Sequence, residues 1–237
     1  MNLVISVSAK RTAQFLSVMV VCFTILGWVT QYEALVSSPE DFSSDDAHGI
    51  VRLFYLGGEA NIPTWYKSAT LLICSGLLFM IAAARKRAQA AFVLYWRDLG
   101  IIFLFLSIDE IASIHEGLGV QLSHLFEAKG VLYFAWVIAG SAIVISILVA
   151  YSKFLRSLPV MATYLFLLSG GIYVGGVIGV KMLEGWYYTL YGQKTLMFMT
   201  IVVVQQLFEM VGIVIFIYSL LSYMRFNVNV GVIRVRE

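Results

Sequence analysis

Long runs of apolar residues, separated by short polar segments, dominate the hydrophobic pattern of this chain. A helix needs about 20 apolar residues to cross a hydrocarbon core roughly 30 Å thick. Six runs are long enough, and they lie at about 13–36, 65–84, 98–116, 131–152, 159–183 and 196–224. They lack the alternation that is typical of membrane β-barrel strands, and backbone inside a bilayer must satisfy its own hydrogen bonds. The pattern predicts an all-α, polytopic transmembrane bundle of six helices, forming a single domain over 1–237.

Composition supports this fold class. Hydrophobic residues make up 60% of the 237 positions and charged residues only 13%, whereas soluble domains have about 45–50% and about 25%. The apolar excess excludes a disordered chain, and 19 Gly, 3 Pro and 2 Cys exclude a collagen or a disulfide scaffold. A formal net charge of +2 gives no sign of nucleic-acid binding. The expected surroundings are therefore a lipid bilayer, with no nucleic acid as partner.

The distribution of basic residues predicts the orientation. Of the sixteen Lys and Arg, only Arg52, Lys67, Lys129, Lys181 and Lys194 fall on one face of the predicted bundle, and the rest fall at the two ends of the chain and in the loops of the other face. Cytoplasmic loops carry the positive excess. Both termini are thus predicted to be cytoplasmic, with a long periplasmic loop at 37–64 and a short cytoplasmic tail at 225–237.

The periplasmic loop has structure of its own in this prediction. Ile50, Leu53 and Phe54 recur at helical spacing, which indicates a short helix lying in the membrane interface. Further along, Asn61 suits the cap of the second span and Pro63 suits its first turn. Glu59 is the residue in this segment that has no structural explanation.

A group of ionisable residues closes the third predicted span, which ends with Asp109, Glu110, His115 and Glu116. An Asp at the centre of a membrane helix costs roughly 2.5 to 3.5 kcal/mol on insertion scales, so such residues normally face the bundle interior or a cavity. On a straight helix Asp109, Ser113 and Glu116 share one face. Glu110 and His115 lie on either side of it, too far apart in angle to chelate one ion from a straight helix. They could cooperate only through neighbouring helices, or if the helix unwinds near His115.

Two other spans contribute acids to the predicted site. Glu184 ends the fifth span, three residues after Lys181, and Glu209 lies well inside the sixth, with Gln205 one turn earlier on the same face. Gly171, Gly175 and Gly179 form a stripe of small residues along the fifth span. Such a stripe lets another helix approach closely.

Several of these features have a purely structural interpretation. Lys181 and Glu184 suit an interfacial ion pair, and the glycine stripe suits helix packing. His115 and Glu116 can simply reach water at the end of a helix. Asp109, Glu110 and Glu209 lie deeper, and intramembrane acids indicate function by default, although a carboxylate and glutamine network can also fix bundle geometry.

Two segments carry a resemblance to known proteins. Residues 58–65, with the pattern GExNxPTW, and residues 107–116, with the pattern SxDExxxxHE, resemble motifs of an uncharacterised family of bacterial six-helix integral membrane proteins. The resemblance implies a location in the bacterial inner membrane. It implies no activity, because the family has none established.

The first functional hypothesis is a metal-dependent membrane hydrolase or oxidoreductase. Carboxylates and imidazole suit zinc, iron or manganese, and the candidate ligands are His115, Glu116, Glu110, Glu59 and Glu184. The metal would activate water against a lipid-linked or periplasmic small molecule. The candidate catalytic residues are Asp109, Glu110 and Glu209. The scarcity of histidine weighs against this hypothesis.

Two other hypotheses stay open from the sequence. Asp109, Glu110 and Glu209 suit the relay of a proton- or cation-coupled transporter or channel, since burial favours proton exchange by carboxyl groups. The chain shows no inverted repeat and no interrupted helix pair, which weighs against transport. A non-catalytic membrane assembly subunit, with the acidic periplasmic loop as its contact surface, is the third hypothesis.

Overall fold

The computed structural model describes residues 5–37, 49–58, 60–126, 129–228 and 233–236. Within them the chain is all-α apart from one small sheet, as predicted. In order, the elements are β1 (Ile5–Ser8), α1 (Ala9–Ser37), α2 (Ile50–Phe54), α3 (Ile62–Arg87), α4 (Val93–Ala112), α5 (Ile114–Phe126), η2 (Gly130–Leu132), α6 (Trp136–Ser157), α7 (Val160–Val174), η3 (Gly175–Val180), α8 (Lys181–Tyr191), α9 (Leu196–Asn227) and β2 (Ile233–Arg236).

Five helical segments of the described chain are long and apolar enough to cross a membrane: Ala9–Glu33, Ile62–Arg87, Trp136–Ser157, Val160–Tyr191 and Leu196–Asn227. They correspond to five of the six predicted spans. The remaining predicted span corresponds to α4, which has 20 residues but carries four charged side chains, at Arg97, Asp98, Asp109 and Glu110. Six spans therefore remain a prediction, as does the orientation in the membrane.

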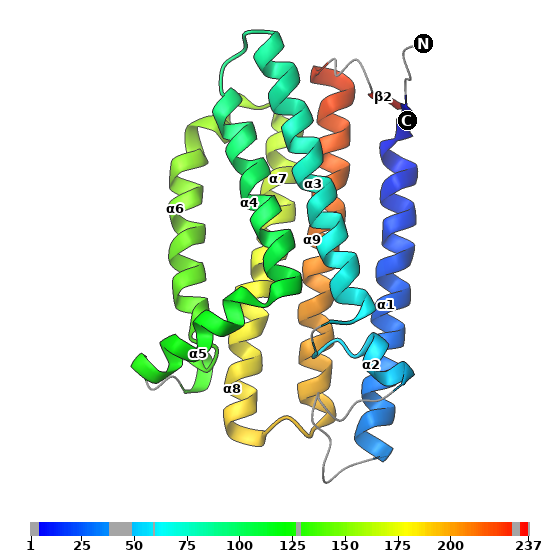
Figure 1. The fold of residues 1–237 in the computed structure, drawn as a ribbon, viewed down its shortest axis with the longest axis vertical. Coiled ribbons are helices and arrows are strands. Elements are labelled where there is room, and N and C mark those ends of the chain that lie inside the picture. The colour runs from blue at the N-terminus through cyan, green and yellow to red at the C-terminus, as the bar shows by residue number, and fades with distance from the viewer. Residues whose placement is uncertain (1–4, 38–48, 59, 127–128, 229–232, 237) are drawn as a thin grey trace.

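Helix α9 is the central element of the bundle. It packs against α1, α3 and α7, while α3 also packs along α4. Figure 1 shows these helices along the long axis of the molecule, with α6 on one side and α1 on the other. Because α9 carries apolar residues on every side, it is suited to a position surrounded by other helices.

The two chain ends meet at one end of the bundle. Strand β1 pairs in parallel with β2, with Ile5 opposite Ile233, and Figure 1 shows this sheet at the same end as the loop between α3 and α4. We call this the terminus end, and the opposite end, where α2, α5 and α8 lie, the loop end. The sheet keeps both termini on the same side of the bundle.

Aromatic side chains fill the bundle near the terminus end. The fully buried Trp96 packs edge-on against Phe154, with ring centroids 5.0 Å apart, and lies 4.8 Å from the ring of Tyr223. Phe103 stacks on Phe216 at 4.6 Å in the same core. This packing joins α4 to α6 and α9 in that half of the bundle.

The local predictions for the periplasmic loop hold where the structure describes them. Residues Ile50–Phe54 form the short helix α2. The side chain of Asn61 caps α3 by accepting a hydrogen bond from the backbone N–H of Thr64 at 2.9 Å, and Pro63 lies in the first turn. Glu59, for which the sequence offered no structural explanation, lies outside the described residues.

The predicted glycine stripe is not the surface on which the helices approach most closely. A Cβ atom at Gly171 or Gly179 would meet nothing within 4 Å, whereas one at Gly176 would lie 2.8 Å from the Cβ of Phe208 on α9. Gly171 lies in α7, and Gly176 lies in the π-helix Gly175–Val180 that follows it. Its wider turn changes which residue faces α9, and a stripe drawn on a regular α-helix does not reproduce that change.

Candidate functional site

Lys67 lies at the centre of a buried cluster of polar side chains from three helices. Its Nζ is 2.5 Å from Oε1 of Glu110 on α4 and 2.9 Å from Oε2 of Glu209 on α9. The Nε2 of Gln205 donates a hydrogen bond to Oε1 of the same Glu209. The side chains of Lys67, Glu110 and Glu209 are only 5%, 13% and 6% exposed. We call these four residues the Lys67 cluster.

A pair of serines holds α3 and α4 together beside this cluster. The Oγ of Ser68 donates a hydrogen bond to the backbone oxygen of Ser107 at 2.7 Å, and the Oγ of Ser107 donates to the backbone oxygen of Ser68 at 2.9 Å. Ser68 follows Lys67 directly, and Ser107 lies three residues before Glu110. The reciprocal bonds therefore fix the distance between the helices at the point where the ion pair forms.

The charges of the Lys67 cluster do not balance when all of its ionisable groups are charged. One ammonium faces two carboxylates, which leaves one negative charge in a site of low dielectric. A net charge in such a site costs free energy, and the uptake of one proton would make these four residues formally neutral. In addition, Oε1 of Gln205 is buried and finds no hydrogen-bond partner among the described residues. It is an acceptor beside the carboxylate of Glu209 that a water molecule would satisfy.

Asp109 points to a different partner. Helix α4 ends at Ala112, and Ser113 takes a left-handed conformation with φ 50° and ψ 38°. Oδ1 of Asp109 accepts a hydrogen bond from the backbone N–H of His115 at 2.9 Å, and Oδ2 lies 2.9 Å from Nδ1 of the same residue. The imidazole meets the ring of Trp136 edge-on, with centroids 5.0 Å apart. Asp109 thus caps α5 and orients the histidine.

The break at Ser113 changes the predicted geometry of this segment. The stripe of Asp109, Ser113 and Glu116 requires a straight helix, and α5 instead turns away from the axis of α4 toward the end of α6 (Figure 1). No Gly or Pro marks the break in the sequence. It depends on the carboxylate of Asp109 satisfying a backbone N–H that the regular helix would have bonded.

Near the loop end, a second polar region surrounds a cavity. Lys181 forms an ion pair with Glu184, with Nζ 3.0 Å and 3.2 Å from its two carboxylate oxygens, and lies 4.2 Å over the ring of Phe134. This confirms the predicted pair, although Glu184 is buried. Both side chains line a cavity of about 210 Å³, together with Glu116 and Lys194. We call it the loop-end pocket.

The three predicted catalytic residues are only partly brought together. Glu110 and Glu209 meet at Lys67, whereas Asp109 holds His115 at the start of α5. The predicted pairing of Gln205 with Glu209 is confirmed. The contact between Gln205 and Glu209 could be predicted from sequence spacing because both residues lie in one helix, four positions apart.

The predicted metal ligands do not converge in the part of the chain that the structure describes. Glu110 contacts a lysine, His115 contacts an aspartate, and Glu116 and Glu184 line the loop-end pocket. Glu59 lies outside the described residues. Among the residues searched, no three His, Cys, Asp or Glu side chains are grouped so that they would hold a metal ion.

Lys67 is the member of the site that the sequence analysis missed, because it was counted among the charges of the outer face. A signal was present. Lys67 shares a helical face with Leu71, Cys74 and Leu78, and all three are buried. A lysine in register with an apolar, inward-facing stripe indicates an interior partner.

The apolar helices and the buried ion cluster are those of a polytopic membrane protein. The chain belongs to a family described as a domain of unknown function, DUF8692, whose model matches residues 15–224. That range contains the Lys67 cluster and the loop-end pocket, and the uncharacterised status of the family agrees with the resemblance found in the sequence. Comparison with curated proteins and with solved structures finds no match.

Proposed function

We propose that this protein is a proton-coupled transporter or channel in which the Lys67 cluster binds and releases the proton. The observation that carries the proposal is the position of Lys67 between the carboxylates of Glu110 and Glu209, buried among three helices. The cluster alternates between one negative charge and neutrality as it loses and gains a proton. Because α3, α4 and α9 each supply one group, the change in charge alters the attraction between three helices.

Irregular backbone beside the cluster supports transport. Ser113, which ends α4, lies three residues after Glu110, and a Cβ at Gly176 in the π-helix would lie 3.3 Å from the backbone nitrogen of Glu209. Interrupted helices are common at transport sites, and π-helical turns are common at functional sites. The sequence offered two objections, the lack of an inverted repeat and the lack of an interrupted helix pair, and these two breaks bear on the second.

Access to the cluster is proposed from the loop end. Glu184, in the loop-end pocket, lies within electrostatic range of both Glu209 and Glu116. The half-buried Tyr173 lies within electrostatic range of Glu209 and Glu110. Toward the terminus end, the interior is filled by the aromatic core around Trp96. With the predicted orientation, the cluster would be reached from the periplasm and closed toward the cytoplasm.

A metal-dependent enzyme has less support. Lys67 provides the positive charge between Glu110 and Glu209 that a metal ion would otherwise provide. The carboxylate of Asp109 is engaged by His115. The described residues offer no group of three ligands. An assembly subunit, in which the cluster only fixes the helix packing, is the outcome that the experiment must separate from transport.

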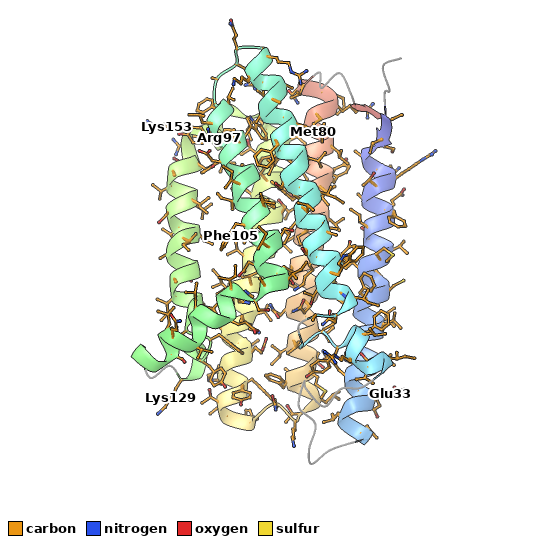
Figure 2. The ribbon with its side chains drawn as sticks, viewed as in Figure 1. Glu33, Met80, Arg97, Phe105, Lys129 and Lys153 are labelled. Atoms are coloured by element: carbon orange, nitrogen blue, oxygen red, sulfur yellow. The ribbon has the colours of Figure 1, made fainter. Side chains whose placement is uncertain are left out.

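Proton flux in liposomes tests the proposal. Purified protein is reconstituted with a pH-sensitive dye inside the vesicles, and a potassium diffusion potential set with valinomycin drives protons inward. The wild-type chain is expected to acidify the vesicles, and Glu209→Gln is expected to abolish that flux, because an amide cannot exchange the proton. Glu33→Gln is the matched control, since Glu33 is exposed on α1 (Figure 2).

The flux of Glu209→Gln is compared only after its thermal unfolding has been shown to match that of the wild-type chain. Glu110→Gln provides a second variant of the same chemistry. Wild-type vesicles that carry no flux above protein-free vesicles, or a Glu209→Gln variant that carries as much as the wild type, would reject transport. The cluster would then have a packing role.

A further inference from the structure

The formal charges cancel among the described residues that line the loop-end pocket. Lys181 and Lys194 supply two positive charges, and Glu116 and Glu184 supply two negative charges. A ligand with only a negative charge would be attracted by the two lysines and repelled by the two glutamates, and a ligand with only a positive charge would meet the reverse. A ligand that carries both signs, at a short separation, matches the whole lining.

Tyrosines also line the pocket. They are Tyr55, Tyr133 and Tyr188, and the ring centroids of Tyr133 and Tyr188 lie 4.5 Å apart. Burial, followed by the negative charge of Glu184, raises the pKa of Tyr55, so this hydroxyl stays neutral at physiological pH. Neutral aromatic rings beside carboxylates stabilise an ammonium group.

Lys181 provides an internal example of that recognition. Its own ammonium lies over the ring of Phe134 at 4.2 Å and pairs with the buried Glu184. The carboxylate of Glu116, by contrast, is exposed at the pocket and has no hydrogen-bond or ion-pair partner within the described ranges. It is therefore the group available to a second ammonium, brought by a ligand.

We propose that the loop-end pocket binds a zwitterionic group in which an ammonium and a phosphate are joined by a short linker. In this proposal the ammonium lies between Glu116 and the tyrosine rings, and the phosphate meets Lys194. Lysine is a common phosphate ligand and supplies three donors. This inference does not rest on the proposed proton transport, because it concerns binding alone.

The size of the pocket limits the ligand. Its volume of about 210 Å³ is below the roughly 300 to 1,000 Å³ that holds a drug-sized molecule. It accepts a group of the size of phosphoethanolamine, whereas a complete phospholipid would leave its acyl chains outside. Leu35, Phe198 and Val202 line the pocket as well. The shared chemistry is thus phosphoethanolamine, either free or as the headgroup of a lipid.

Calorimetric titration of the full-length protein in an uncharged maltoside detergent tests the free form. O-phosphoethanolamine is expected to bind. Ethanolamine alone leaves Lys194 without a phosphate, and inorganic phosphate alone leaves Glu116 without an ammonium, so each is expected to bind at least about tenfold more weakly. Glu116→Gln and Lys194→Met should each weaken O-phosphoethanolamine by a similar factor. Glu33→Gln and Lys129→Met, which change the same residue types at positions that do not line the pocket, should bind as the wild type does.

Native mass spectrometry of protein released from nanodiscs tests the lipid form. Phosphatidylethanolamine should be retained in preference to phosphatidylglycerol, and Glu116→Gln should lose that preference. Binding in the first experiment alone supports a free ligand, and binding in the second alone supports a lipid headgroup. Binding in neither, binding of phosphate as tightly as phosphoethanolamine, or equal binding by Glu116→Gln would overturn the proposal. None of these outcomes depends on proton flux.

Discussion

The ammonium of Lys67 lies 2.9 Å from Oε2 of Glu209, although 142 residues separate the two along the chain. The contact joins the second turn of α3 to the middle of α9. Both side chains are almost fully buried, so each charge depends on the other for compensation. The geometry of the candidate site therefore depends on how the central helix packs against α3.

Replacing Lys67 should destabilise the protein strongly. Lys67→Met removes the ammonium that faces the carboxylates of Glu110 and Glu209, and breaking a buried pair in this way costs about 3–5 kcal/mol. Thermal unfolding in detergent measures the change. Lys129→Met, at an exposed position, should change the free energy of unfolding by no more than about 0.5 kcal/mol.

A double variant separates loss of charge balance from loss of packing. In Lys67→Met with Glu209→Gln, one uncompensated carboxylate is removed, so part of the stability should return relative to Lys67→Met alone. A double variant that is less stable by the sum of the two single effects would contradict the coupling between these residues.

Gly176 should not tolerate a methyl group. A Cβ there would lie 2.8 Å from the Cβ of Phe208 and 3.0 Å from the backbone oxygen of Gln205. Gly176→Ala would push the π-helix away from α9 at the level of Glu209, at a cost of about 1–3 kcal/mol. Gly179→Ala is the matched control in the same π-helix, because its Cβ would meet nothing within 4 Å. Equal melting temperatures for the two variants would show that the close approach is absent.

Asp109 should hold the start of α5. Asp109→Ala removes the acceptor for both the backbone N–H and the imidazole of His115, so amide hydrogen exchange should rise across 114–126 while α4 stays protected. Mass spectrometry of peptides from this segment measures the exchange. Asp98→Ala, which removes an exposed carboxylate paired with Arg97, should leave it unchanged. Exchange in 114–126 that stays at the wild-type rate would argue against capping by Asp109.

Asn61 has two roles that can be separated by substitution. Its Oδ1 caps α3, and its Nδ2 donates to the backbone oxygens of Tyr55 at 2.7 Å and Gly58 at 2.6 Å. Asn61→Ala loses both and should cost about 0.5–2 kcal/mol or more. Asn61→Asp keeps the cap but loses the donor, so its free energy of unfolding should lie between those of the wild type and Asn61→Ala. If Asn61→Asp is no more stable than Asn61→Ala, the cap contributes nothing measurable.

Contacts between neighbours along the chain were predictable from the sequence. The apolar runs predicted the helices that are long enough to cross a membrane, the spacing of Ile50, Leu53 and Phe54 predicted α2, and Asn61 was found as a cap. The Lys181–Glu184 pair was found by its spacing within one helix. In each case the physical cause lies within about one turn of the helix, where periodicity and capping rules apply.

By itself, then, the sequence determined that the chain is an apolar, helical protein suited to a bilayer, because hydrophobic periodicity is a local property. Only the tertiary structure decided which ionisable groups meet. Lys67 pairs with Glu110 and Glu209 because three helices pack together there. Asp109 turns to His115 because the backbone breaks at Ser113. The free energy of a buried charge depends on partners that folding brings from distant parts of the chain, and spacing along one helix does not specify them.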